Sequence, residues 1–506
     1  MGLLRIWVRP FLLISLAGVS LYLLGIAGDF FHLTRVITTL SMVMPTHQGD
    51  ARQLITSLLE LIAGLLGLLF TVSAILVELS ATRYSSRVVD LFVSDRVNLS
   101  YFTLTVVTPL YGFWLALTLD ILPWPTFHFT LFSFLVSLDL VLLVPYINYL
   151  FGCLTPDAIV RRIVGSVDLA RVEKSGGRGL PRARQNLVTS VSQLSDVVLS
   201  SMNTADINLS ARAIEAIRDL GVSYLRHKSR LPPLWFDFSP EIFPGMPAAK
   251  RQELRESHTW VEMFCFKQLE LVFVQSAGRF RELCTAVASC TRALGEVAGG
   301  VGDTCSRELC LLFFNTLLRH AMNVADVRTL SHCLYQYRLL GEAHLHARDG
   351  ASLDKIAFYF KYYGQECEKR GLGFVMEIVA YDLRRLVQEA WHHHREGVPA
   401  LLEVILEVDH IPDTAEGELS QRGVRKSQIL LAAFFLREGA ADFAEKIALD
   451  LRDEPAERIE SMEKELSTRT SAEFWEIQDR DANFYYVPDE MRPALEQFFR
   501  RFRGGV

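Results

Sequence analysis

The stretch FLVSLDLVLLVPYINYL, residues 134–150, decides the class of fold, because it is strongly apolar and yet carries Asp139 near its middle. It belongs to an apolar run, Phe127–Gly152, that is longer than the ~20 residues an α-helix needs to cross a bilayer. An aspartate at the centre of such a helix costs about 2.5–3.5 kcal/mol on insertion scales. We therefore expect Asp139 to face the interior of a helix bundle or a water path, or to be protonated.

Two roles for Asp139 remain open at the level of sequence. In the first, its side chain is hydrogen-bonded and links two membrane helices. In the second, it binds or relays a cation or a proton. The hydroxyl side chains that are candidate partners for the first role are Ser133, Ser137, Thr103, Thr105 and Thr108.

Three further apolar runs precede this one, and they are Phe11–Gly28, Leu54–Leu79 and Leu99–Leu119. An alternative interpretation of the first run is a cleaved signal peptide. The run is longer than the ~7–15 apolar residues of a signal-peptide core, which favours an uncleaved transmembrane helix. The sequence therefore predicts a four-helix transmembrane bundle over residues 1–152.

The positions of the arginines predict the orientation of this bundle. Arginines precede the first run, recur in the 80–98 connection and follow the fourth run, whereas the other two connections hold few. Cytoplasmic loops of membrane proteins are enriched in Lys and Arg. We therefore expect the N-terminus, the 80–98 loop and everything after residue 153 to be cytoplasmic.

A basic segment, residues 153–184, follows the fourth run as a short helix and a linker. The cations singled out in it are Arg161, Arg162, Arg171 and Lys174. Next to a membrane, such a cluster attracts anionic lipid headgroups at ~1 kcal/mol per cation. The alternative is that these residues serve only as topology signals.

The rest of the 506 residues has the pattern of amphipathic helices joined by short breaks. QNLVTSVSQLSDVVLSSM (185–202), for example, places apolar residues at i, i+3, i+4 and i+7. Because strand signals are nearly absent, we predict an all-α protein with a large cytoplasmic helical domain, divided into residues 185–300 and a helical stack over 301–506. The rhythm resembles an α-solenoid, without a tetratricopeptide or ankyrin signature.

The sequence contains no recognisable enzyme or metal motif. A phosphate-binding loop, GxGxxG, GxSxG and HExxH are all absent, so we expect no catalytic residue, no cofactor and no enzyme activity. The eight cysteines include no CxxC pair, which is typical of reduced, buried thiols in the cytoplasm. The triplet His392–His394 fits the negative end of a helix dipole, so no metal site is predicted. Nucleic acid is not an expected partner.

The loop after the second run carries a family resemblance. FTVSAILVELSATRYSSRVVDLFVSDRVN, residues 70–98, resembles the signature of the bacterial predicted membrane proteins grouped as domain of unknown function 2254. The matching positions are Tyr84, Ser85, Arg87, Phe92, Asp95 and Arg96. Thr71 stands where the family has Ser, and Ser86 where it has Pro. The resemblance implies a bacterial inner-membrane protein and supplies no activity. We also expect residues 83–98 to form a surface helix with Asp95 near Arg87 or Arg96.

The second apolar run has one face of polar and small residues. The residues that recur at helical spacing on this face are Thr56, Glu60, Gly64, Gly67, Thr71, Ala74 and Glu78. Small residues allow close helix packing in lipid. Alternatively, the face lines a water-filled path in an oligomer. Glu60 and Glu78 are separated by about 27 Å of helix, so each fits one headgroup layer.

Two classes of function follow from these features. The first is an oligomeric ion channel or transport-like protein, which the buried polarity of two spans favours, with a regulatory helical domain in the cytoplasm. The alternative is a membrane-anchored scaffold or sensor whose helical domain binds a protein partner. The expected partners are the lipid bilayer, further copies of the chain, anionic lipid and a cytoplasmic protein.

Overall fold

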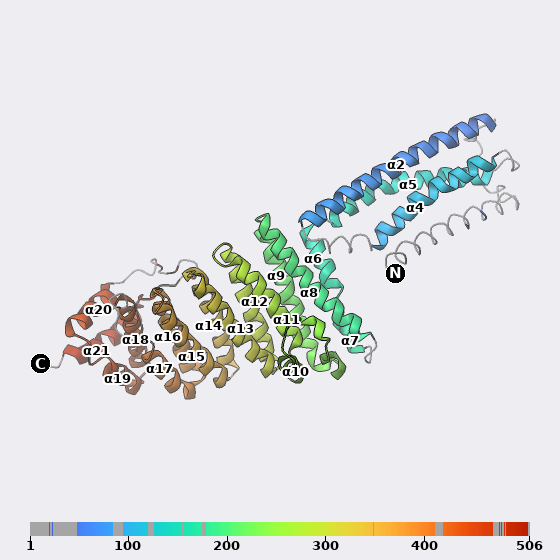
Figure 1. Cartoon of the computed structure of the whole chain (residues 1–506). Coiled ribbons are helices and arrows are strands. Elements are labelled where there is room, and N and C mark those ends of the chain that lie inside the picture. Colours follow the sequence, from blue (N-terminus) through green and yellow to red (C-terminus); the bar gives the residue numbers. More distant parts are fainter. Residues whose placement is uncertain are drawn as a thin grey trace. The chain divides into compact units, whose positions relative to one another are not determined.

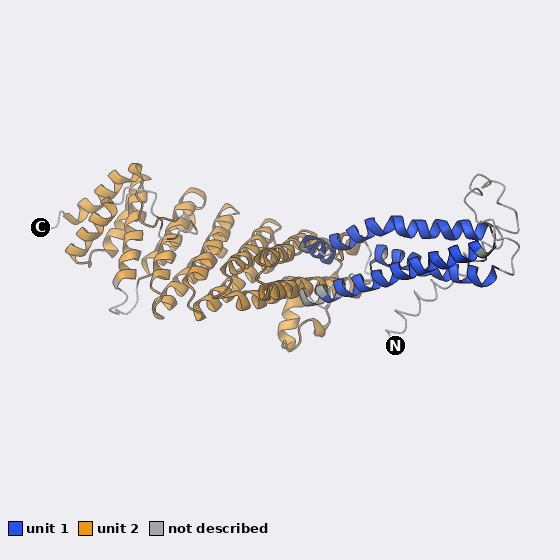
Figure 2. Cartoon of the chain, turned by 90° about the horizontal axis from the view of Figure 1, so that it is seen from above, with its two compact units in different colours: residues 1–163 blue, residues 164–506 orange. Residues whose placement is uncertain are grey.

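The computed structural model describes residues 20, 23, 48–83, 95–119, 126–153, 155–174, 179–347, 349–409, 418–468, 475, 477, 480 and 482–503. Over these residues the protein is helical, and extended pairing is limited to an isolated bridge between Ile477 and Ala482. The predicted all-α class is therefore confirmed. The chain divides into two compact units, residues 1–163 and 164–506 (Figure 2).

The first unit contains the membrane helices. They are α2 (Gln48–Arg83), α4 (Arg96–Thr118) and α5 (Thr126–Cys153), followed by α6 (Pro156–Gly165) (Figure 1). Among the described residues, three helices are long and apolar enough to span a bilayer, where the sequence predicts four. The remaining predicted span, Phe11–Gly28, lies outside the described residues except for Ser20 and Leu23. Membrane type and orientation stay predictions.

The first unit has a narrow core and a large apolar surface. Apolar residues of α2 recur at heptad-like spacing, and with Tyr111 and Phe132 they form the core between the helices. A Cβ atom added at Gly112 would lie 2.5 Å from the Phe132 ring, so glycine permits this close packing. Outward-facing residues such as Phe134 and Val141 are 60% and 70% exposed. An exposed surface of large apolar side chains is what contact with hydrocarbon requires.

The second unit is an α-solenoid of two helical layers (Figure 1). From α11 to α16, each helix packs against the next helix and against the helix two positions further on. One layer consists of α8 (Leu180–Asn203), α11 (Trp260–Ser276), α13 (Thr304–Asn323), α15 (Gly350–Glu368) and α17 (Val398–Leu406). The other consists of α9 (Ile207–His227), α12 (Arg281–Gly300), α14 (Val327–His346), α16 (Phe374–His393) and α18 (Glu418–Arg437). The division at residues 300 and 301 stays a prediction.

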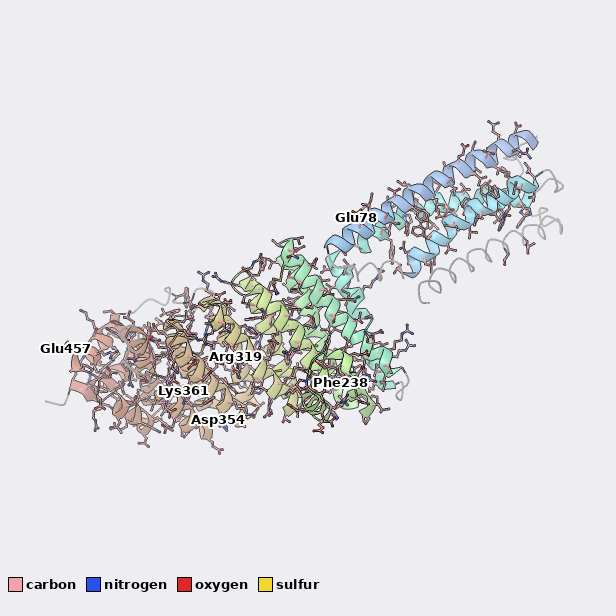
Figure 3. All side chains as sticks on the ribbon, in the orientation of Figure 1. Glu78, Phe238, Arg319, Asp354, Lys361 and Glu457 are labelled. Carbon is pink, nitrogen blue, oxygen red and sulfur yellow. The ribbon has the colours of Figure 1, made fainter. Side chains whose placement is uncertain are left out.

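Shorter helices complete the second unit. These are α7 (Leu169–Lys174), α10 (Ala248–Glu256), α19 (Ala441–Asp450), α20 (Ala456–Thr468) and α21 (Arg492–Arg503). The last of them packs on α18 and α19. Large side chains such as Trp260, Tyr337 and Phe360 are fully buried in this unit, and Figure 3 draws its side chains on the ribbon.

Three connections in the described part of the solenoid share one turn. A residue with positive φ precedes an aspartate that caps the next helix, in the pairs Ala205–Asp206, Gly302–Asp303 and Ala325–Asp326. Each aspartate accepts a hydrogen bond from the backbone amide three residues later, at 3.0–3.2 Å. This repeated turn reverses the chain between helices and sets the rhythm seen in the sequence.

Candidate functional site

A polar cluster lies where α4 begins and α5 ends. Asp95 caps α4 by accepting hydrogen bonds from the amides of Val97 and Asn98, at 3.0 and 3.2 Å. The Tyr149 hydroxyl donates to Asp95 Oδ1 at 2.7 Å, and Arg162 Nη2 lies 2.5 Å from Asp95 Oδ2. Burial alone would raise the pKa of Asp95, but the Tyr149 and Asn98 hydrogen bonds and the Arg162 charge outweigh it and lower the pKa. The carboxylate is therefore ionised at neutral pH.

The pairing of Asp95 with Arg162 is not indicated by the sequence. There, Asp95 belongs to the family motif, Arg162 is a candidate ligand of lipid headgroups, and Arg87 or Arg96 is the expected partner of Asp95. The side chains of those two arginines lie outside the described residues. The same holds for four other positions of the predicted sites, namely Tyr84, Ser85, Phe92 and the side chain of Lys174.

A small pocket adjoins this cluster. It has a volume of about 310 Å³ and is lined by Tyr149, Gly152, Ala158, Arg161 and Arg162. Arg161 is exposed, whereas Arg162 is partly buried by its contact with Asp95. Of the predicted headgroup ligands, Arg161 thus remains available to an anion, while the charge of Arg162 is neutralised within the unit. Arg171 is an exposed residue of α7.

Hydrogen bonds continue from this cluster to Asp139. Tyr146 donates to the Asn98 side chain, its ring stacks on Tyr101 at 4.1 Å, and the Tyr101 hydroxyl donates to the Asp139 carbonyl oxygen at 3.0 Å. The Thr105 hydroxyl lies 3.1 Å from Asp139 Oδ1. The same hydroxyl lies 3.0 Å from the Tyr101 carbonyl oxygen, so its single proton is shared between two acceptors. These contacts join α4 to α5.

The surroundings of Asp139 agree in part with the first predicted role, a hydrogen-bonded link between two membrane helices. Its side chain is fully buried, and two of the predicted hydroxyls, those of Thr105 and Thr108, interact with it. Thr103 and Ser137 donate instead to backbone carbonyls of their own helices. Within the described residues Asp139 Oδ2 lacks a geometrically formed hydrogen bond. One oxygen is thus held between helices by Thr105, and Thr108, another predicted partner, also interacts with the Asp139 carboxyl group.

The polar face of α2 is separate from Asp139. Glu60, Thr71 and Glu78 are all exposed, and Thr71 donates to the Gly67 carbonyl oxygen of its own helix (Glu78 is labelled in Figure 3). A Cβ atom built on Gly64 or Gly67 meets nothing within 4 Å. The four predicted intramembrane residues therefore do not form one site, since three face outward and Asp139 faces α4.

The second unit contains a buried arginine site. Arg480 forms two hydrogen bonds with Asp382, and these two side chains are 1% and 0% exposed. Arg480 also donates to the Ser331 carbonyl oxygen at 3.2 Å, and its guanidinium lies 4.9 Å from the Tyr335 ring. Arg338 Nε lies 3.1 Å from Asp382 Oδ1. Asp382 thus holds an arginine brought to α14 and α16 from nearly 100 residues further along the chain.

Residues after Arg480 extend this contact. Phe484 stacks on Tyr381 at 4.9 Å, and its carbonyl oxygen accepts a hydrogen bond from Arg384 at 3.1 Å. Tyr485 donates to Glu377. We call Asp382, Ser331, Tyr335, Tyr381 and Arg338 the arginine site. Sequence reasoning missed it, because a single arginine in DRDANFYY has no spacing that identifies a partner.

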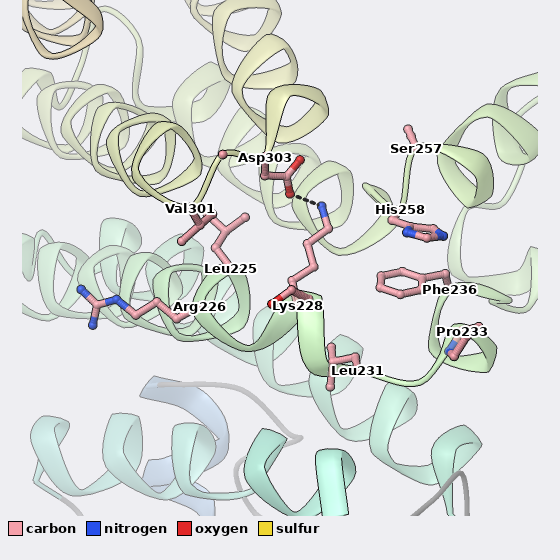
Figure 4. Close-up of a pocket in the computed structure, with 12 residues that line it drawn as sticks. Leu225, Arg226, Lys228, Leu231, Pro233, Phe236, Ser257, His258, Val301 and Asp303 are labelled. Carbon is pink, nitrogen blue, oxygen red and sulfur yellow. Dashed lines mark hydrogen bonds and ion pairs between the residues drawn. The ribbon is translucent and has the colours of Figure 1, made fainter. Parts of the chain in front are cut away.

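A second buried ionic cluster borders a pocket of about 410 Å³ (Figure 4). Lys228 Nζ donates to Glu262 at 2.6 Å, to Asp303 at 2.6 Å and to Ser306 at 2.8 Å. Burial raises the pKa of Glu262 despite the nearby Lys228 charge. All three ammonium protons are used, so Lys228 has none left for a ligand. The cluster therefore joins the end of α9 to α11 and α13.

These features define a helical membrane protein whose second unit is an α-solenoid. Residues 4–201 match the model of a family described as predicted membrane protein (DUF2254). This match confirms the resemblance predicted from residues 70–98. Comparison with curated proteins and with solved structures found no match.

Proposed function

We propose that this protein is a membrane-anchored scaffold or sensor whose solenoid binds an extended, arginine-containing segment of a protein partner. The observation that supports the proposal is the burial of Arg480 in the arginine site. Removing a guanidinium from water is costly unless its partners are well placed. Here a carboxylate, a carbonyl oxygen and an aromatic ring meet it together.

The arginine site has the chemistry of selective recognition. Two parallel hydrogen bonds from one guanidinium to Asp382 require the planar fork of arginine, which lysine lacks. Phe484 and Tyr485 then add stacking on Tyr381 and a hydrogen bond to Glu377. The segment recognised is therefore an arginine followed four and five residues later by aromatic side chains.

The chain's own C-terminal segment occupies this site. A tethered segment competes at an effective concentration in the millimolar range. A partner would therefore bind only when its segment is tighter or when the protein's own segment is released. This arrangement gives a sensor a resting state in which the site is filled from within.

Hydrogen exchange on the full-length protein in detergent tests the proposal. In the Arg480→Ala variant, deuterium uptake of residues 482–487 should rise, while α14 and α16 stay protected. The Arg480→Lys variant should behave similarly, because one ammonium cannot replace two parallel bonds. Arg500→Ala is the matched control, since Arg500 is 68% exposed and pairs with Glu496 across one turn of its own helix. Unchanged uptake in Arg480→Ala would contradict the proposal.

The second candidate is an oligomeric path for ions, and the exposed polar face of α2 is the observation that favours it. Glu60 is exposed on a helix that is otherwise suited to lipid. Such a carboxylate is favoured where another subunit or water covers it. The oligomeric state in detergent distinguishes the candidates, because a strict monomer has no path lined by several copies of α2.

A further inference from the structure

Three metal-ligating side chains that are not part of the arginine site meet on the solenoid. They are His346, in the last turn of α14, and Glu389 and His393 of α16. Their ligand atoms all lie within 4.8 Å of one another. The two imidazole rings are 4.5 Å apart, and His393 Nε2 lies 3.8 Å from Glu389 Oε2. Two helices thus present three ligands to one point.

The backbone explains why these side chains converge. Glu389 and His393 are four residues apart, so they lie on the same face of α16, one turn from each other. Glu342 and His346 repeat this Glu-x-x-x-His spacing on α14. The two helices are neighbours in one layer, and their C-terminal ends lie together. Their matching faces therefore meet.

The charges around this point favour a cation. Glu342, the carboxylate at the matching position of α14, pairs with Arg338 of its own helix. Arg385 is only a distant counter-ion for Glu389, at 4.0 Å. The ends of both helices also carry the negative pole of the helix dipole.

The histidine triplet of the sequence divides into different environments. The His392 ring meets the Phe434 ring edge-on at 5.8 Å, and His394 lies beside Gly350 and Gly397. Only His393 faces His346. The triplet alone therefore does not identify a site, because the completing ligand comes from another helix.

We propose that His346, Glu389 and His393 bind a divalent transition-metal ion, with Zn²⁺ the closest fit. Two imidazole nitrogens and one carboxylate oxygen form a three-ligand zinc set that leaves a position for water. Bonds of ~2.0–2.1 Å place tetrahedral donors about 3.4 Å apart, so the ligand atoms, which lie within 4.8 Å of one another, must approach by at most about 1.4 Å. The bound ion joins α14 to α16, and this inference does not depend on the proposed function.

Calorimetric titration of the full-length protein in detergent with ZnCl₂ tests the site. The wild type should bind one ion that is lost in His346→Ala and His393→Ala. We expect each substitution to weaken binding more than ~10-fold, since even outer partners of a metal site contribute 10–100-fold. His392→Ala is the matched control, because it removes a histidine of the same triplet and leaves the three ligands.

A second measurement separates ligand loss from unfolding. Zn²⁺ should raise the thermal unfolding temperature of the wild type and of His392→Ala, because a ligand bound only by the folded state stabilises it. Zn²⁺ should leave the unfolding temperatures of His346→Ala and His393→Ala unchanged, and the circular dichroism of both variants should still be that of a helical protein. Equal zinc binding by wild type and the two ligand variants would overturn the proposal. So would an equal loss of binding in His392→Ala.

Discussion

Replacement of Lys228 by methionine probes the buried cluster in the solenoid. The substitution keeps an unbranched side chain, one atom shorter, and removes three hydrogen bonds, at 2.6, 2.6 and 2.8 Å. Glu262 and Asp303 are then left without their shared cation, and Glu262 is only 5% exposed. Breaking a buried ion pair in this way costs about 3–5 kcal/mol. Because Asp303 is 18% exposed and can recover some hydration, we expect a value near the lower limit.

Thermal unfolding followed by circular dichroism measures this loss. For a unit that spans residues 164–506, the unfolding entropy is about 0.7 kcal/mol/K, so about 3 kcal/mol corresponds to a fall of roughly 4 °C in the unfolding temperature. The double variant Lys228→Met/Glu262→Gln should recover part of it, because no buried charge then remains on residue 262.

The pH dependence gives an independent control. The pKa of Glu262 is raised by burial even with Lys228 present, so its protonation stabilises the folded state at acid pH. Without Lys228 the defect should shrink as the pH falls and Glu262 takes up a proton. This reasoning would be refuted if Lys228→Met lowered the unfolding temperature by less than about 2 °C, or if the double variant were no more stable than Lys228→Met.

Three further predictions concern other parts of the chain. Asp139→Asn should leave the unfolding temperature unchanged, because an amide oxygen still accepts from Thr105, whereas Asp139→Leu should cost about 0.5–2 kcal/mol. Loss of ion flux in reconstituted vesicles of a folded Asp139→Asn protein would instead place Asp139 on a path. Ala325→Gly should stabilise the solenoid by about 0.5–1 kcal/mol, because Ala325 has a φ of 53°, and Gly302→Ala, at 73°, should destabilise it. A lower unfolding temperature in Ala325→Gly, or a higher one in Gly302→Ala, would contradict the shared turn. The pKa of Asp95 is lowered by its pairing. The pairing therefore stabilises the folded protein at a pH above 3.8, the ordinary pKa of an aspartate, and this stabilisation is lost as the pH falls below that value. Asp95→Asn should remove this acid-dependent step, and its persistence would exclude Asp95 as the cause.

The membrane helices and the character of the Asp139 environment could be predicted from sequence, because both depend on local composition. A run of apolar residues indicates a span whatever its neighbours are. Thr105 was among the expected partners of Asp139, because few hydroxyl groups lie on the adjacent span. The exposure of Glu60 could not be predicted, since one helix does not indicate which of its faces meets another.

The long-range pairs could not be predicted, because no local pattern encodes them. Asp95 and Arg162 are separated by 67 positions, and Asp382 and Arg480 by 98. Each pair becomes adjacent only when helices stack. The histidine set shows the same limit, since Glu389 and His393 share a visible spacing, whereas His346 joins them only through the layer of the solenoid.

Binding of a labelled peptide with the sequence of residues 475–488 tests the central claim most directly. Fluorescence anisotropy with the full-length protein in detergent should show tighter binding to Arg480→Ala than to the wild type, whose arginine site is filled. A peptide with Lys in place of its Arg should bind the variant more than ~10-fold more weakly, because it loses the two parallel bonds to Asp382. Adding Asp382→Asn to the variant should remove this preference. Equal binding of the two peptides to Arg480→Ala would contradict the account.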